Sequence, residues 1–242
     1  MLDAHCHVDL YPEPATVADR AAASGAFTVM VTNLPSAYDR SRPHVESRRR
    51  IRLALGLHPL LAAQHGAERD LFQARVATAS FIGEVGLDFS PEGKATADVQ
   101  VQSFEFVLQS IAGLPKFISI HSRRAEAKVV EMLRAAKRTS AVFHWYSGPI
   151  GVLRQAISDG HYFSVNSAML NSDGGRRIIS AVPPDRLLTE TDGPFVTIAG
   201  RPAEPSDIGL VEEGVARIWK VAPSEVRSRV AQNFRSVVSS LA

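Results

Sequence analysis

The feature that most constrains the fold of this chain is a regular alternation of short apolar runs and longer amphipathic stretches. The apolar runs are rich in β-branched and aromatic residues and lie approximately at 2–8, 26–32, 51–57, 80–86, 115–121, 139–145, 160–166 and 186–192. Between them, stretches such as 97–112 and 123–137 repeat their apolar residues at helical spacing. Strands that alternate with helices indicate βαβ units and a parallel sheet.

About eight such units predict an α/β fold of the (β/α)8 or TIM barrel type, which typically needs about 250 residues. We find no linker, low-complexity tract or change in composition, so we expect residues 1–242 to form a single barrel domain. A doubly wound open sheet is the competing fold, because the number of strands does not distinguish the two. The Pro-rich segment 194–205 is expected to be a long loop, followed by helices at 206–220 and 224–240.

Charge and cysteine content narrow the class of protein only slightly. The 27 Lys and Arg residues exceed the 25 Asp and Glu residues by two, which neither indicates nor excludes a polyanionic partner. The single cysteine, Cys6, excludes an internal disulfide and is compatible with a reducing compartment. The sequence shows no apolar run of the ~20 residues that span a bilayer and no signal-peptide pattern at its start. We therefore expect a cytoplasmic protein without membrane association.

The first predicted strand carries a His-x-His pair, His5 and His7. Because alternate side chains of a strand share a face, Asp3, His5 and His7 are expected to point together into the barrel mouth. Cys6 then points toward the helices as a small packing residue. By itself the pair is a weak signal, since two histidines satisfied by local hydrogen bonds would look the same.

Further candidate ligands occur where other predicted strands end, namely at His58, Glu84, His121, His144 and Asp192. Barrel enzymes assemble their active sites at the carboxyl ends of the strands. Imidazole together with carboxylate suits divalent metals such as Zn²⁺, Mn²⁺ or Fe²⁺, whereas Mg²⁺ prefers more oxygen ligands. These groups exceed the needs of one zinc ion, and a carboxylate such as Glu84 can bridge two ions. Paired ions fit phosphoester cleavage by an activated water.

Other chemistries have less support in the sequence. It contains no Gly-x-Gly-x-x-Gly, Walker-type loop or Gly-x-Ser-x-Gly elbow. We interpret Asp173-Gly174-Gly175 as a turn rather than a phosphate-binding loop. The histidines outside the strand ends, at positions 44, 65 and 161, are interpreted as surface or packing residues.

Taken in order, these motifs resemble those of the TatD family of metal-dependent nucleases. The motifs are Asp3-Ala4-His5-Cys6-His7, His58-Pro59, Glu84-Val85-Gly86-Leu87-Asp88, His121-Ser122-Arg123, His144-Trp145-Tyr146-Ser147-Gly148 and Glu190-Thr191-Asp192-Gly193-Pro194. The resemblance covers essentially the whole chain. It implies a TIM barrel with two divalent cations (Mg²⁺, Mn²⁺ or Zn²⁺) that hydrolyses DNA, often single strands from the 3′ end.

The resemblance also implies a role for each matching residue. His5, His7 and Asp192 would hold one ion, His121 and His144 the other, and Glu84 would bridge the two. Asp192 would also orient or deprotonate the attacking water, so Glu84 and Asp192 are the expected catalytic residues.

Substrate-binding roles fall on residues beside these ligands. His58 is similar to a family histidine near the scissile phosphate, which implies substrate positioning rather than metal ligation. Arg123 and Arg124 follow His121 and either neutralise phosphates or form a solvated surface at a helix start. Trp145 and Tyr146 either stack on a base or belong to the core.

The chain departs from the family pattern around the expected substrate groove. His144-Trp145-Tyr146 replaces the usual His-Cys-Phe, and Gly193-Pro194-Phe195 replaces Ala-Pro-Tyr. The segment Glu190–Phe195 resembles most the QatD branch, found in a bacterial anti-phage operon. That resemblance implies partner proteins of a Qat-type system encoded alongside the chain.

Strand parity predicts a second layer of polar groups below the ligands. Glu190 lies one layer beneath Asp192, and Asp3 one layer beneath His5. Either carboxylate would accept a hydrogen bond from a ligating imidazole or form a buried structural ion pair. Asn33 and Asn166, at two other strand ends, either contact phosphate or cap turns.

Two rival functions remain open at this point. An amidohydrolase would share the His-x-His pair, two later histidines and the terminal aspartate, but its metals are often bridged by a modified lysine where this chain has Glu84. A D-aminoacyl-tRNA deacylase is a related alternative. The other rival is a non-catalytic or partner-gated subunit of a defence complex, although no expected ligand is missing.

Overall fold

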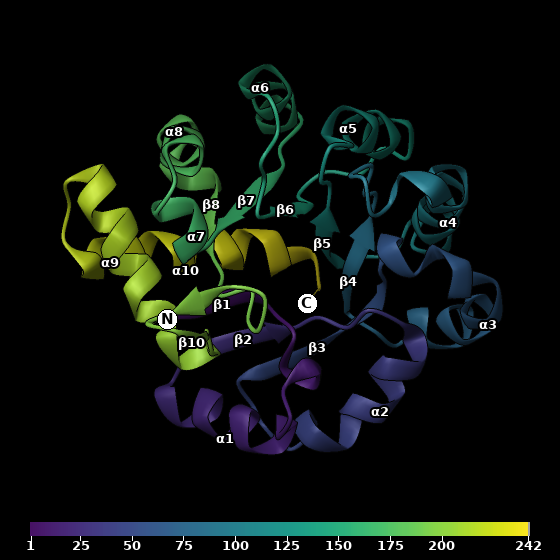
Figure 1. Cartoon of the computed structure of the whole chain (residues 1–242), viewed down its shortest axis with the longest axis horizontal. Helices are drawn as coiled ribbons and strands as arrows, with labels where there is room; N and C mark the ends of the chain where they lie inside the picture. The colour runs from purple at the N-terminus through teal and green to yellow at the C-terminus, as the bar shows by residue number, and fades with distance from the viewer. Residues whose placement is uncertain (242) are drawn as a thin grey trace.

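The computed structural model describes residues 1–241, and its centre is one sheet of eight parallel strands in sequential order (Figure 1). The strands are β1 Leu2–Cys6, β2 Phe27–Met30, β3 Ile51–Leu57, β4 Phe81–Gly86, β5 Phe117–His121, β6 Val142–His144, β7 Tyr162–Val165 and β8 Leu187–Thr189. Each lies within one of the eight runs expected from the sequence, so the predicted strands are confirmed.

The sheet curves until its last strand meets its first. The Thr189 hydroxyl donates to the Leu2 carbonyl at 2.6 Å. Just beyond β8, the Asp192 amide donates to the His5 carbonyl at 3.0 Å, and the His7 amide to the Gly193 carbonyl at 2.8 Å. This closure confirms the (β/α)8 barrel over the doubly wound alternative, whose edge strands would not meet.

Helices surround the barrel on the outside (Figure 1). They are α1 Pro14–Ser24, α2 Pro35–Val45, α3 His65–Val76, α4 Ala97–Ser110, α5 Glu126–Ala135, α6 Ile150–Ser158, α7 Ser167–Leu170, α8 Asp173–Ala181, α9 Ile208–Trp219 and α10 Pro223–Val238. Short 3-10 turns lie at Val8–Leu10, Pro59–Gln64, Lys94–Thr96, Pro184–Arg186, Pro205–Asp207 and Ser239–Leu241. Among the described residues, no helix is both long and apolar enough to cross a bilayer.

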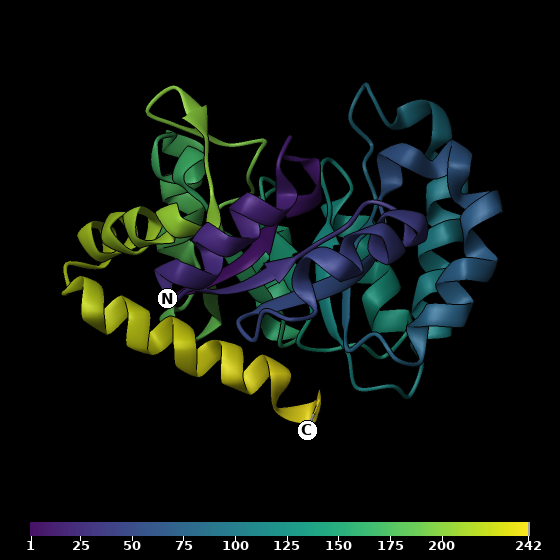
Figure 2. The same ribbon diagram turned by 90° about the horizontal axis from the view of Figure 1, so that it is seen from below.

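The last helix, α10, closes the end of the barrel where the strands begin (Figure 2). Phe234 packs against Phe27 and Phe117, at ring distances of 5.1 and 5.9 Å. The Asn233 amide donates to the carbonyls of Pro184 and Leu187, both at 2.8 Å. With this end closed, the opposite end remains available for a site.

Two local predictions were wrong. The segment 173–175 is not a turn but the first turn of α8, because the Ser172 hydroxyl accepts from the Gly175 amide at 3.1 Å and caps the helix. The segment 194–205 is not only loop, since β9 Thr197–Ile198 pairs with β10 Arg201–Pro202. The two residues between them both have positive φ, at 51° and 79°, as a tight hairpin turn requires.

The apolar core lies between the strands and the helices, and Cys6 belongs to it. The Cys6 thiol is fully buried among apolar side chains of α1, α2 and β2. The interior face of β1 carries Asp3 and His5 instead, and His7, directly after the strand, faces the same way. The strand parity inferred for this segment is therefore confirmed.

Candidate metal centre

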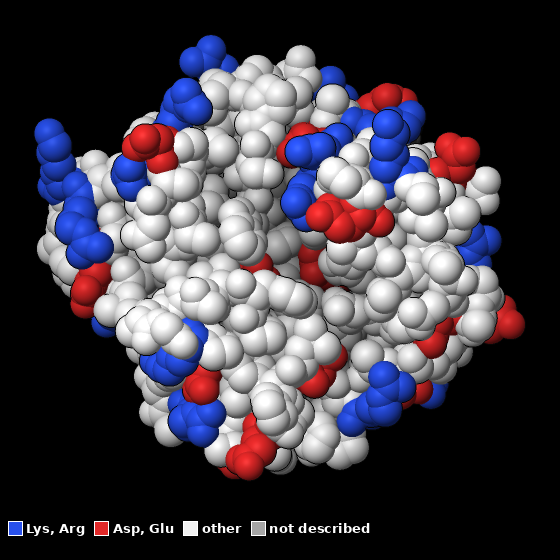
Figure 3. All heavy atoms as spheres, viewed as in Figure 1, with Lys and Arg blue, Asp and Glu red and all other residues white. Residues whose placement is uncertain are grey.

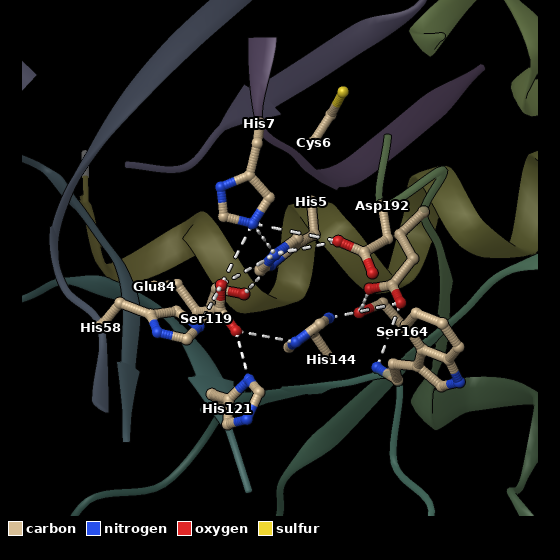
Figure 4. Close-up of polar contacts among 12 residues, drawn as sticks. His5, Cys6, His7, His58, Glu84, Ser119, His121, His144, Ser164 and Asp192 are labelled. Atoms are coloured by element: carbon tan, nitrogen blue, oxygen red, sulfur yellow. Dashed lines mark hydrogen bonds and ion pairs between the residues drawn. The ribbon is translucent and has the colours of Figure 1, made fainter. Parts of the chain in front are cut away.

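Glu84 of β4 lies at the centre of the site, and each of its carboxylate oxygens faces a different group of imidazoles (Figure 4). Oε2 lies 3.1 Å from His7 Nε2, 3.3 Å from His58 Nε2 and 3.6 Å from His5 Nε2. Oε1 lies 2.5 Å from His121 Nδ1 and 2.9 Å from His144 Nε2.

The electrostatics of Glu84 follow from this environment. Burial by itself raises the pKa of its carboxyl, but the imidazoles of His58 and His144 more than offset burial and hold that pKa well below its usual range. Glu84 is therefore a carboxylate, the form that binds cations.

Asp192 approaches the same cluster from the end of β8. Its Oδ1 atom lies 3.7 Å from His5 Nε2 and 3.9 Å from His7 Nε2, and it is buried without a hydrogen-bond partner. Burial raises the pKa of Asp192 to about 7. The residue has a left-handed φ of 48°, a conformation that costs a non-glycine residue on the order of 1 kcal/mol, so the closed barrel seam must hold it in place.

Four buried atoms of this cluster bear on whether it fits a cation. Asp192 Oδ1 and His7 Nδ1 have no hydrogen-bond partner, and the Nε2 atoms of His5 and His7 face each other at 3.2 Å. Buried polar atoms are rarely left unsatisfied, and a divalent ion would occupy the lone pairs of both nitrogens and the carboxylate oxygens.

Three sets of side chains are close enough to hold an ion, and they overlap. They are His5, His7 and Glu84; His5, His144 and Asp192; and His58, Glu84 and His121. The imidazole and carboxylate donors suit Zn²⁺ or Mn²⁺. The residues present therefore fit bound divalent metal, and all six predicted ligands lie in one cluster.

His121 is held from behind by a residue that the sequence analysis did not single out, Asp88. The His121 Nε2 atom lies 2.8 Å from Asp88 Oδ2, which leaves Nδ1 to face Glu84. Burial raises the pKa of Asp88, but its contacts with His121 and Ser90 lower it to about 2. An imidazole that donates to a carboxylate is oriented and made more basic. The sequence did offer a signal for Asp88, because it is an acidic residue just after β4 in the same motif as Glu84.

Glu190 lies behind His144, as strand parity predicts, and of the two expected contacts it makes the ion pair rather than the hydrogen bond. Its Oε1 atom is 3.6 Å from His144 Nδ1 and accepts from the Asn166 side chain at 3.0 Å and the Trp145 amide at 3.1 Å. The Ser164 hydroxyl also donates to Glu190. Asn166 thus holds Glu190 and caps α7 through the Met169 amide, and it does not face the cavity.

The same prediction for Asp3 was wrong. Asp3 accepts hydrogen bonds from the Thr191 amide at 2.9 Å, the Thr191 hydroxyl at 2.5 Å and the His5 amide at 3.3 Å. Its partners are Thr191 and the His5 amide at the β1–β8 seam rather than an imidazole, because barrel closure brings Thr191 against it. The Nδ1 atom of His5 contacts the Ser119 hydroxyl instead, at 2.8 Å. Ser119 shares the interior face of β5 with His121, and that parity was the signal for it.

His58 differs from the other imidazoles in its proton position. The Leu60 amide donates to His58 Nδ1 at 3.2 Å, so a neutral His58 carries its proton on Nε2. Burial lowers the pKa of His58 and favours this neutral form. Nε2 then has a proton to donate and no lone pair for a metal, which fits the substrate-positioning role expected for His58.

The cluster opens into a cavity of about 450 Å³, seen as the central hollow in Figure 3. Its wall includes Arg123, half-buried Trp145 and the exposed Phe195. Arg123 lies 3.6 Å from Glu92 and is 51% exposed, so it is available at the mouth. Tyr146 is a core residue, since it is buried and donates to the Pro149 carbonyl at 2.8 Å.

The histidines outside the strand ends take no part in the site. His161 is fully buried beside Phe143, and His65 contacts the His58 carbonyl at 3.0 Å. His44 lies half-buried in α2. Their interpretation as packing or surface residues is confirmed.

Comparisons with known proteins agree with this geometry. Residues 2–239 match the model of a family described as TatD related DNase. The chain is 28% identical to the uncharacterized metal-dependent hydrolase YabD of Bacillus subtilis, over 97% of each protein. It is 25% identical to the human deoxyribonuclease TATDN3 over 63% of this chain and 57% of that protein. The crystal structure of YjjV, a TatD homologue of Escherichia coli, has the same fold, with a TM-score of 0.87 at 23% identity over 98% of this chain and 97% of that one.

Proposed function

The chain belongs to the TatD-related DNase family of metal-dependent hydrolases, and from this premise we propose that it hydrolyses phosphodiester bonds of single-stranded DNA from the 3′ end. The observation that carries the proposal is the arrangement around Glu84. One carboxylate oxygen faces His5 and His7 and the other faces His121 and His144. A carboxylate placed in this way is suited to bridge two divalent cations, with Asp192 completing the first set.

The chemistry that two such cations supply is to lower the pKa of a water molecule and to stabilise negative charge on a phosphate. The chain itself contributes the proton transfers and the positioning. Burial raises the pKa of Asp192 to about 7, so its carboxylate is suited to accept a proton as the water oxygen bonds to phosphorus. The P–O3′ bond then breaks, and the same proton passes to the leaving oxygen.

The remaining polar groups position the substrate. His58 lines the cavity with its Nε2 atom 3.3 Å from Glu84 Oε2, so a phosphate bound beside Glu84 would lie within reach of the Nε2 proton. Arg123, at the mouth, neutralises phosphate charge. Half-buried Trp145 and exposed Phe195 offer apolar surfaces to bases in the same cavity. These groups match a nucleotide polymer better than a small amide or lactone.

The test is cleavage of end-labelled single-stranded DNA by the purified protein, with Mg²⁺ or Mn²⁺ against EDTA and with Asp192→Ala as the control. We expect stepwise shortening from the 3′ end that requires both the metal and Asp192. Absence of cleavage by folded, metal-loaded protein would overturn the proposal. Turnover of a D-aminoacyl-tRNA or a lactone under those conditions would then favour the deacylase or amidohydrolase.

We also propose that the chain acts in anti-phage defence with partner proteins of a Qat-type operon in the cytoplasm. Support comes from the segment Glu190–Phe195, whose sequence resembles the QatD branch of the family. Cells that carry the chain with its neighbouring genes should lose phage protection when Asp192 is replaced by Ala. Undiminished protection in that variant would contradict a catalytic role in defence.

A further inference from the structure

A second, shallower groove adjoins the metal-site cavity. It is lined by Arg123, Arg124, Glu126, Ser147, Gly148 and Pro149, and it shares Arg123 and Ser147 with the cavity. Figure 3 shows Lys and Arg side chains gathered on the rim of the central hollow toward α5. A substrate that extends out of the cavity past Arg123 therefore enters a groove with a second guanidinium.

Arg124 gives this groove a positive charge that is not paired with a carboxylate. Within the described part of the chain, residues 1–241, Arg124 forms no ion pair, although its side chain is exposed. Some exposed arginines are neutralised, as Arg134 is by Asp159 at 2.6 Å and Arg201 by Asp207 at 2.7 Å, and Arg123 itself lies 3.6 Å from Glu92. Arg124 thus remains free to bind an anion.

The one carboxyl group of the groove does not cancel this charge. Glu126 is 6% exposed and accepts a hydrogen bond from the Arg124 amide at 3.3 Å. It lies beneath Gly148, where any side chain would come within 2.6 Å of it. Burial raises the pKa of Glu126. Its contacts hold the floor of the groove, while the guanidinium of Arg124 remains at the surface.

The backbone at Arg124 is also unusual, with a left-handed φ of 58°. This conformation is uncommon for a residue with a Cβ and costs on the order of 1 kcal/mol. Arg124 has this conformation two residues before α5 begins. It follows Arg123 directly, and the two arginines line adjoining parts of the cavity and the groove.

We propose that Arg124 forms a second phosphate subsite, which binds the phosphate next to the scissile one and makes the enzyme prefer oligonucleotides to single phosphodiesters. This inference rests on the proposed function and deepens it. The scissile phosphate lies at the Glu84 cluster with His58 and Arg123. The strand leaves the cavity over the segments that follow β5 and β6, and its next phosphate lies against Arg124 and Ser147.

Kinetics with two substrates test the subsite in the metal-loaded enzyme. The substrates are decathymidylate and the p-nitrophenyl ester of thymidine 5′-phosphate, which has a single phosphodiester. In Arg124→Ala the preference for decathymidylate over the ester, as a ratio of kcat/KM values, should fall about tenfold, because a charge-assisted contact is lost. The loss should appear mainly in KM, and Arg124→Lys should restore part of it. Ala and Lys have the same Cβ as Arg, so the strained backbone is matched.

Arg154→Ala is the matched control, since Arg154 is exposed on α6 and lines neither cavity. It removes one positive charge at another surface and should leave the preference unchanged. An equal loss on both substrates in Arg124→Ala, an unchanged ratio, or the same loss in Arg154→Ala would each overturn the subsite.

Binding to metal-free protein separates this inference from the proposed function. The affinity for fluorescent decathymidylate in EDTA is measured by anisotropy at several salt concentrations. The slope of log K against log salt should decrease in magnitude by about 0.7 in Arg124→Ala, as expected for one lost phosphate contact on a single strand. If the wild type binds in this way but cleaves neither substrate, the hydrolytic proposal fails and the subsite stands. An unchanged slope overturns the subsite whatever the enzyme cleaves.

Discussion

The barrel interior holds two layers of buried carboxyl groups that differ in the kind of group they contact. In the lower layer, Asp3 is surrounded by donors from Thr191 and the His5 amide, and Glu190 by donors from Asn166 and others. In the upper layer, Glu84 meets imidazoles on both oxygens, and Asp192 Oδ1 meets no donor.

The contacts of the carboxyl groups indicate a different role for each layer. A buried carboxyl group with all its partners supplied by the chain fastens strands together, because removing it would leave the partners unsatisfied. In the upper layer the partners of Glu84 are imidazole nitrogens, which are themselves potential metal ligands, and Asp192 Oδ1 has no donor at all, so the buried charge of Asp192 is costly until a cation is bound. The lower layer therefore stabilises the barrel, and the upper layer holds the candidate metal ligands.

The largest effect should come from Glu84→Ala in the upper layer. This change removes the group that both sets of imidazoles face, so we expect kcat/KM to fall by at least about a thousandfold, equivalent to ~4 kcal/mol of transition-state stabilisation. Metal content by mass spectrometry should fall with it, while circular dichroism should retain the fold. Glu105→Ala, an exposed carboxylate on α4, is the control. Undiminished turnover by metal-replete Glu84→Ala would refute the bridging role.

In the lower layer, Asp3→Ala should act on stability. It leaves the Thr191 amide and hydroxyl without their acceptor, and we expect the free energy of unfolding to fall by about 3 kcal/mol. Asp192→Ala, which removes an acceptor with an unpartnered oxygen, should cost less than about 1 kcal/mol. Both are measured by urea denaturation in EDTA. Equal losses in the two variants would erase the distinction between the layers.

A third change probes the support behind an upper-layer imidazole. Asp88→Ala removes the carboxylate that orients His121, and metal affinity should fall about 10- to 100-fold. Titration with a chelating dye measures the affinity, and excess metal should recover the activity. Asp88→Asn keeps an acceptor for the Ser90 amide and should lose less. An unchanged affinity in Asp88→Ala would mean that the fold orients His121 without it.

The smallest effect is expected from Cys6→Ser, outside both layers. Cys6 points away from the site (Figure 4), so activity and metal content should stay within about twofold of the wild type. The hydroxyl is more costly to bury than the thiol, and stability should fall by about 1 kcal/mol. Loss of bound metal in this variant would show that Cys6 affects the upper layer after all.

Strand parity explains how much of the site could be predicted from the sequence. The period of two along a strand is a local property of the extended chain, so His5, His7 and Cys6 were assigned to their correct faces. The carboxyl ends of parallel strands meet at one end of a barrel. The sequence therefore places five further candidate ligands at that same end, namely His58, Glu84, His121, His144 and Asp192.

Partners between strands could not be predicted in this way. Asp3 pairs with Thr191 across the seam, His5 with Ser119 on β5, and His121 with Asp88 in the loop after β4. Each contact depends on how the closed barrel rotates and spaces its strands, and neither quantity is encoded in the periodicity of one segment.

The alternating architecture, the interior residues and the candidate metal-binding side chains follow from the sequence, because they depend on spacing along the chain. The tertiary structure alone decided which carboxyl groups are satisfied, where the proton of His58 lies and that a second arginine extends the cavity. Hydrogen-bond satisfaction and cavity shape arise from atoms brought together by barrel closure, so they exist only in the folded molecule.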